Sequence, residues 1–327
     1  MSDRVNPSRS PGIRRWMLAI GLFAVLPMLA FALLAGRSLL NQQQTALHVE
    51  LQQQADFAAR ELAREVRVVF ATLESLATSD AALRGDYAAL HAHAGRIVAM
   101  SPRIGAITAV DAAGDRRFST LAPFAVQLPP TSLGEFDKRV LATGTPQISP
   151  LTTGSISGKK LVSFSVPVKD GNKIAMILRA SMWTDAIGEV VHEQPLPGTW
   201  IVAVVDQNMI QIARSRDSAR FVGLPATEPT QAAIRADRTT PYAAVSHDGV
   251  AMTASIARVA GTQWRVVVAA PSTSLDTEVW RAFQSTLWIR LLCAVLSALG
   301  AWFLARALQH QVQTAARTVA SHDIDRG

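Results

Sequence analysis

The longest regular pattern in the chain is an apolar stripe of helical period between Leu39 and Ser79, a stretch without Gly or Pro. Its steps follow the 3.6-residue repeat of a helix that buries one face. At 1.5 Å per residue, such a helix is roughly 60 Å long. It either packs on the surface of a globular core or rises from a membrane as a stalk, and we favour the stalk because of the segment before it. The stripe consists of Leu40, Leu47, Leu51, Ala55, Ala58, Leu62, Val66, Val69, Leu73 and Leu76, with Gln44 at the remaining step.

Two apolar segments lie near the ends of the chain. Residues 16–36 carry no charge and are long enough to cross the roughly 30 Å hydrocarbon layer of a bilayer. Residues 287–305 have a charge-free core at 291–304. We predict a transmembrane helix in each. The alternatives are a signal peptide cleaved near Ala30-Phe31-Ala32 for the first segment, and a buried hydrophobic helix for the second.

The charges beside the first segment predict its orientation. Short basic flanks stay in the cytoplasm, so the N-terminus is expected there. Two spans then place both termini in the cytoplasm and residues 37–286 outside. The layout is typical of a two-pass protein of the bacterial inner membrane, with residues 37–286 in the periplasm. The basic flank consists of Arg4, Arg9, Arg14 and Arg15, opposed by Asp3 alone.

Between the spans, short apolar strands alternate with turn residues. Asp170-Gly171 and Asp248-Gly249 each separate two apolar runs, which is a strong hairpin signal. Val110-Asp111 and Val205-Asp206 open two such units, which indicates an internal repeat of one antiparallel sheet with helices on one side, an α+β fold. The expected strands are 104–110, 116–120, 147–151, 161–168, 173–180, 200–205, 209–214, 242–246, 250–258 and 263–270, and the expected helices are 86–100, 132–143, 183–193 and 228–236.

These patterns predict an ordered series of segments along the chain. The two lobes are named for their expected distance from the membrane. The series is a cytoplasmic N-terminus (1–15), transmembrane helix 1 (16–36), a stalk helix (37–79), a membrane-distal lobe (80–198), a membrane-proximal lobe (199–275), a connecting helix with transmembrane helix 2 (276–305) and a cytoplasmic tail (306–327).

Composition supports the membrane interpretation and excludes other classes. The chain is 49% hydrophobic and 17% charged, and its mean hydropathy is +0.19. The net charge of +7 is dispersed, without a basic run interleaved with aromatic residues, so nucleic-acid binding is not expected. The single cysteine, Cys293, permits neither a disulfide within the chain nor a cysteine zinc site.

No catalytic or metal-binding arrangement is expected. His91 and His93 are spaced by two on a predicted helix, so their rings point apart. The segment Gly154–Gly158 lacks the Gly-Lys-Ser ending of a phosphate-binding loop. We expect no catalytic domain within this chain. We therefore expect a non-enzymatic module without a cofactor, whose output domain is C-terminal to this chain or on a partner.

One cation within an apolar strand suggests a binding site. Arg179 falls late in an otherwise apolar strand, where a guanidinium needs either a structural carboxylate or an anionic ligand as its partner. If side chains alternate regularly through three strands, one concavity of the distal sheet holds the candidate ligand-binding residues. We expect Arg179→Ala to abolish binding while the domain stays folded. The candidates are Arg116, Phe118, Ser163, Ser165 and Arg179.

Three local segments, 72–80 (TLESLATSD), 166–171 (VPVKDG) and 212–223 (IARSRDSARFVG), resemble those of double Cache sensor domains. The resemblance covers residues 37–286 and implies two lobes with PAS-like folds. Members of the family are input domains of bacterial sensor histidine kinases, diguanylate cyclases and chemoreceptors. The resemblance implies a small-molecule ligand in the distal lobe and transmission through the membrane helices.

The ligand class is narrowed by one departure from the family pattern. Amino-acid-binding members carry Tyr and Trp around a key Arg, whereas this chain offers 116–120 (RRFST) and has only two tyrosines, Tyr87 and Tyr242. This argues against an amino-acid ligand and leaves an anionic molecule among the candidates. We expect a homodimer through the stalk helix. The alternative functions are a membrane-anchored scaffold whose lobes bind another protein, and an extracytoplasmic hydrolase.

Overall fold

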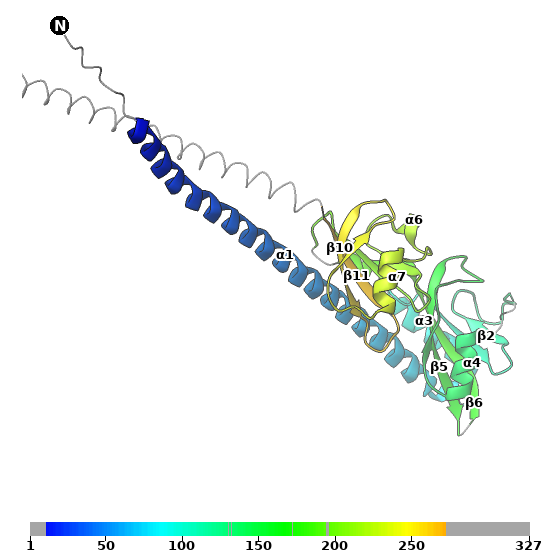
Figure 1. Ribbon diagram of the computed structural model, residues 1–327. Coiled ribbons are helices and arrows are strands. Elements are labelled where there is room, and N and C mark those ends of the chain that lie inside the picture. Colours follow the sequence, from blue (N-terminus) through cyan, green and yellow to red (C-terminus); the bar gives the residue numbers. More distant parts are fainter. Residues whose placement is uncertain (1–10, 130, 132, 172, 194–195, 273–327) are drawn as a thin grey trace, which may run out of the picture. The chain divides into compact units, whose positions relative to one another are not determined.

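The computed structural model describes residues 11–129, 131, 133–171, 173–193 and 196–272 (Figure 1). Residues Ala46–Ser274 form one compact unit that contains both sheets. The predicted second span, 287–305, lies outside the described residues, as do the side chains of 16–36. Among the residues that are described, none of the helices combines the length and apolar character required to cross a membrane.

The predicted long helix is confirmed. α1 runs from Pro11 to Ala77 without interruption of its helical backbone (Figure 1). Beyond residue 46 its side chains divide as the period predicts, because Leu51, Leu62 and Leu73 are buried while Arg60 and others of the opposite face are exposed. The helix therefore buries a continuous apolar face along the compact unit.

The distal sheet follows two short helices in the chain. All its strand pairs are antiparallel, and the strand order is β2-β1-β6-β5-β3, with β4 paired to β5. The strand expected at 147–151 is instead two shorter strands, β3 and β4. The elements are α2 (Asp80–Leu83), α3 (Tyr87–Met100), β1 (Ala106–Asp111), β2 (Arg116–Ser119), α4 (Glu135–Thr143), β3 (Gln147–Ile148), β4 (Thr152–Thr153), β5 (Lys160–Asp170), β6 (Lys173–Trp183) and α5 (Thr184–His192).

The proximal sheet has the order β8-β7-β11-β10-β9 and is also antiparallel. A short helix, α6, was not expected from the sequence. The elements are β7 (Ile201–Val205), β8 (Gln211–Arg214), α6 (Ser218–Phe221), α7 (Glu228–Arg235), β9 (Tyr242–Val245), β10 (Ala251–Arg258) and β11 (Arg265–Pro271).

The two sheets repeat one topology, as the sequence predicted. In each, the first strand lies between the second strand and the last, and the next-to-last strand lies beyond the last. The turn after the first strand is also the same. Asp111 Oδ1 accepts hydrogen bonds from the N–H groups of Ala113 and Asp115. Asp206 Oδ1 accepts them from Asn208 and Ile210. A carboxylate that receives its own turn's N–H groups stabilises a tight return.

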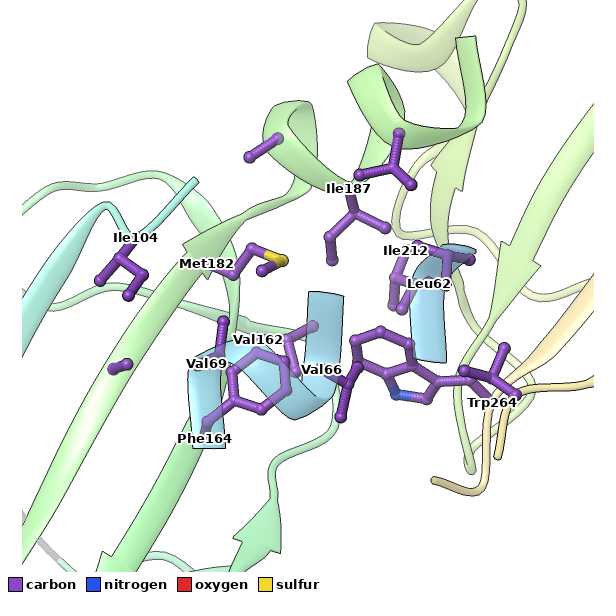
Figure 2. Close-up of a cluster of buried hydrophobic side chains, with 14 of the residues drawn as sticks. Leu62, Val66, Val69, Ile104, Val162, Phe164, Met182, Ile187, Ile212 and Trp264 are labelled. Atoms are coloured by element: carbon purple, nitrogen blue, oxygen red, sulfur yellow. The ribbon is translucent and has the colours of Figure 1, made fainter. Parts of the chain in front are cut away.

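A single hydrophobic core joins α1 to one face of each sheet. In Figure 2, Val66 of α1 lies between Phe164 of the distal sheet and Trp264 of the proximal lobe, and Leu62 of α1 lies beside Ile212. The two aromatic rings are 6.0 Å apart between centroids. Ile187 of α5 joins the same cluster, so the segment linking the two sheets is also anchored in it. Because close-packed interiors transmit displacement, a shift of either sheet is felt by α1.

Candidate ligand site in the distal sheet

A row of polar side chains crosses the face of the distal sheet that points away from α1. Directly paired residues on neighbouring strands project from the same face, and here the pairing runs continuously across the sheet. Their neighbours Ala109, Leu178 and Phe164 project from the other face into the core with α1. The row, from β2 to β3, is Ser119, Thr108, Arg179, Ser165 and Gln147.

Arg179, at the centre of this row, has a structural carboxylate as its partner. Its Nε lies 2.9 Å from Oδ1 of Asp137, and its Nη2 lies 2.6 Å from Oδ2. Asp137 is fully buried and also accepts a hydrogen bond from the Gly134 N–H at the start of α4. The guanidinium lies 5.7 Å from the ring centre of Phe136. A two-pronged pair of this kind fixes α4 over the sheet.

Burial dominates the electrostatics of this pair. It raises the pKa of Asp137, while the charge of Arg179 and the Gly134 N–H act in the opposite direction. Burial likewise lowers the pKa of Arg179, opposed by Asp137. The pairing changes the expectation for Arg179→Ala. Removing one member of a buried pair leaves the other uncompensated, so a loss of stability is now expected along with any loss of binding.

Arg116 lies on the same face, and among the described residues it forms no ion pair with a carboxylate. It occupies the start of β2, and its guanidinium donates to the Pro129 carbonyl and to the Ser155 hydroxyl, both at 2.9 Å. Its Nε is buried and has no hydrogen-bond partner. Burial, and then the charge of Arg179, lower the pKa of Arg116. Among the described residues no carboxylate forms an ion pair with Arg116, and Asp137 pairs with the neighbouring Arg179 only.

Regular alternation fails at one point, and this separates Phe118 from the other candidates. The pairing of β1 with β2 shifts between Ala109 and Val110, so that Val110 faces Arg116 while Ala109 faces Phe118. A bulge of this kind turns the following side chains to the opposite face. Phe118 therefore points into the core, where its ring packs edge-on against His91 at 5.4 Å.

The two serines of β5 lie where alternation places them. Ser165 pairs with Arg179 across the sheet, and its hydroxyl is 3.4 Å from Asp137 Oδ1. Ser163 is buried opposite Ser181 on the same face. The structure thus groups Arg116, Ser163, Ser165 and Arg179 on one face of the sheet.

Asp137 is the residue that sequence reasoning did not identify. It stands in the third position of α4, where an acidic side chain that reaches back to the residue before the helix forms a capping box. That signal predicts a helix start at Gly134, and it does not predict that the carboxylate also pairs with a strand. Within the described part of the chain, no group of three or more His, Cys, Asp or Glu residues is arranged to hold a metal.

Comparison with known proteins finds solved structures with the same fold. No family model matches the chain, and the comparison with curated proteins gave no match. Solved structures do match. The extracellular domain of rpHK1S-Z16, described as a histidine kinase, aligns with a TM-score of 0.60 and 14% identity over 72% of this chain and 97% of its own. The chain shares the fold of these sensor domains. The expected resemblance to double Cache domains is thereby confirmed for the fold.

Two chemoreceptors show the same likeness. The ligand-binding domain of *Pseudomonas fluorescens* CtaA, in complex with L-leucine, aligns with a TM-score of 0.57 and 12% identity over 72% of this chain and 99% of its own. That of *Pseudomonas aeruginosa* PAO1 PctB, in complex with L-Arg, aligns with a TM-score of 0.55 and 10% identity over 70% of this chain and 96% of its own. At sequence identities of 10–14%, this similarity is evidence for a shared fold only.

Proposed function

We propose that residues 37–286 form the extracytoplasmic input module of a bacterial signalling protein that detects a small molecule and is not itself an enzyme. The fold shared with the extracellular domain of a histidine kinase and with the ligand-binding domains of chemoreceptors supports this. So does the single core that ties both lobes to α1, because it supplies a physical route from a ligand to the helix. In this proposal 16–36 and 287–305 are the two spans, and the stalk forms a homodimer.

The proposed ligand is a small organic anion bound by Arg116 in the distal lobe. The choice of an anionic ligand rests on the environment of Arg116. It is half-buried, it lacks a carboxylate among the described residues, and its Nε has no partner. A carboxylate offered by a ligand would complete its hydrogen bonds and relieve the repulsion from Arg179. Ser163 and Ser165 lie on the same face as further hydrogen-bonding groups.

Transmission in this proposal depends on different affinities for two states. A ligand shifts an equilibrium only by the difference between its affinities for them. Binding at Arg116 draws together the loops that carry Pro129 and Ser155, which already meet at its guanidinium. The sheet behind them shares its core with α1. The expected movement is the small translation or rotation of a helix that is usual for such switches.

The test is a thermal-shift screen of the full chain in detergent micelles against organic acids, amines and sugars. We expect organic acids to raise the unfolding temperature, because a ligand that binds only the folded state stabilises it. Arg116→Ala should then weaken binding by about tenfold or more, the usual effect of losing a hydrogen bond to a charged group. Binding should be unchanged in the control Arg117→Ala, whose side chain pairs with Asp111 instead.

Two results would contradict the proposal. Stabilisation by amines or sugars alone would reject an anionic ligand. No stabilisation by any small molecule, together with capture of a specific protein by the lobes, would favour the scaffold alternative.

A further inference from the structure

The proximal sheet has its own cavity, on the face turned away from α1. The cavity measures about 50 Å³ and is lined by strands β7 to β11 and by the segments beside α7. Its walls are mainly small and apolar, among them Ala203, Ala254, Val267 and Ala269, while its polar residues include Gln211, Arg214 and His247. A volume of roughly 10–15 Å³ is enough for one water, so this cavity has room for a small organic group.

The position of Gln211 corresponds to that of Arg116 in the distal sheet. In both lobes the pairing of the first and second strands shifts near the end of the first strand. After that shift Val110 faces Arg116, and Val205 faces Gln211. The same bulge therefore turns the first residue of the second strand to the outer face in each lobe. The repeat thus provides two equivalent faces with different polar groups.

Gln211 is a buried amide with an unused acceptor. Gln211 is only 3% exposed, and its side-chain Nε2 lies 2.7 Å from Nε2 of His247. Its Oε1 is buried and has no hydrogen-bond partner. Leaving a buried acceptor unpaired is unfavourable. A hydrogen-bond donor brought by a ligand would satisfy it.

Arg214 supplies a buried positive charge to the same cavity. Its Nε donates to the Arg216 carbonyl at 3.0 Å, and its guanidinium stacks on Phe221, 4.3 Å from the ring centre. Its only ion pair among the described residues is long, 3.6 Å from Nη2 to Oδ2 of Asp248. Asp248 also pairs with the exposed Arg220 at 3.2 Å. The charge of Arg214 is therefore opposed by Asp248, which Arg220 also contacts, and at longer range by Asp217.

We propose that this cavity is a second ligand site, which takes a short aliphatic carboxylate. Its carboxylate pairs with Arg214, and its alkyl chain lies against the alanine-rich wall. The volume of the cavity limits the chain to about two to four carbons. The carboxylate that pairs with Arg214 has no proton to donate, so only a hydroxyl group of the ligand, as in a short hydroxy acid, would supply the donor that Gln211 Oε1 lacks. A simple carboxylate such as propionate tests the pairing with Arg214 alone. The site lies in a different sheet from Arg116, so it is independent of the ligand proposed there.

The experiment is isothermal titration of the full chain in detergent micelles with sodium propionate. We expect saturable binding by the unaltered chain. Arg214→Met, which keeps an apolar stem of similar length, should weaken binding at least tenfold. Arg235→Ala is the matched control. It removes an exposed arginine of the same lobe that pairs with Glu228 and does not line the cavity, so binding should stay within twofold of the unaltered chain.

A second series keeps the proposal testable if Arg214→Met fails to fold. Ala269→Val fills the wall without changing a polar group, and it should weaken butyrate binding more than acetate binding. Arg116→Ala should leave propionate binding unchanged. The proposal is overturned if propionate does not bind the unaltered chain, if Arg116→Ala abolishes its binding, or if hexanoate binds as tightly as propionate in both the unaltered chain and Ala269→Val.

Discussion

At the scale of single residues, three arginines have three different environments that the sequence alone does not distinguish. Arg179 is paired with a buried carboxylate. Arg116 bonds only neutral groups in the described residues. Arg214 stacks on an aromatic ring and shares a distant carboxylate with Arg220. The first environment is that of a structural ion pair, and the other two are those to which we assign the proposed ligands.

The pair of Arg179 and Asp137 should contribute to stability and not only to binding. Arg179→Met leaves the fully buried Asp137 carboxylate without its partner, which typically destabilises a protein by about 3–5 kcal/mol. The double variant Arg179→Met/Asp137→Leu should recover most of this loss, since an apolar pair has no charge to desolvate. Chemical denaturation of the three proteins measures both effects. An unfolding midpoint for Arg179→Met equal to that of the unaltered chain would show that the pair has no structural role.

At the scale of elements, the turn after β7 connects the two lobes directly. Asp206 Oδ2 accepts a hydrogen bond of 2.9 Å from the N–H of Leu151, in the loop before β4 of the distal sheet. Gln207 in the same turn lies 3.5 Å from the Ile148 carbonyl. The equivalent Asp111 in the distal lobe pairs with Arg117 of its own lobe instead. One turn motif thus serves a local role in one lobe and a connecting role in the other.

This difference predicts distinct effects for two equivalent substitutions. Asp206→Ala and Asp111→Ala both remove a carboxylate that stabilises a turn, and each should lower stability by about 1–3 kcal/mol. Only Asp206→Ala leaves the Leu151 N–H without its acceptor. Hydrogen exchange of the segment 148–153 should therefore accelerate in Asp206→Ala and remain unchanged in Asp111→Ala. Equal exchange in the two variants would mean that Asp206 does not hold the lobes together.

At the scale of the whole molecule, the proposed function depends on where the two sheets lie relative to a membrane. The helical backbone of α1 continues from residues 16–36 into the part that packs against both sheets. If 16–36 spans a bilayer with its basic flank in the cytoplasm, the sheets are necessarily on the opposite side.

Reporter fusions test this topology. Alkaline phosphatase joined after residue 200 should be active, because it requires an oxidising compartment, and green fluorescent protein at the same position should be dark. Both results should reverse for fusions after residue 320. A fluorescent fusion after residue 200 would place the sheets in the cytoplasm and remove the basis of the proposed sensor.

The long helix, most strands and the repeat of two lobes were predictable from the sequence, because their signals are local. The apolar period of α1 follows from the geometry of a single helix. The Asp-Gly turns and the paired Val-Asp motifs are signals that extend over only a few residues. Alternation along β5 and β6 likewise placed Ser163, Ser165 and Arg179 on one face.

The tertiary structure alone decided which of these residues meet. The bulge between β1 and β2 arises from the pairing of two strands, so no count along one strand could show that Arg116 and Phe118 face opposite ways. The partner of Arg179 is 42 residues away in sequence, on a helix whose capping pattern gives no sign of a strand beneath it. Secondary structure follows from short-range periodicity, whereas the charge balance of a site depends on long-range packing that brings separate elements together.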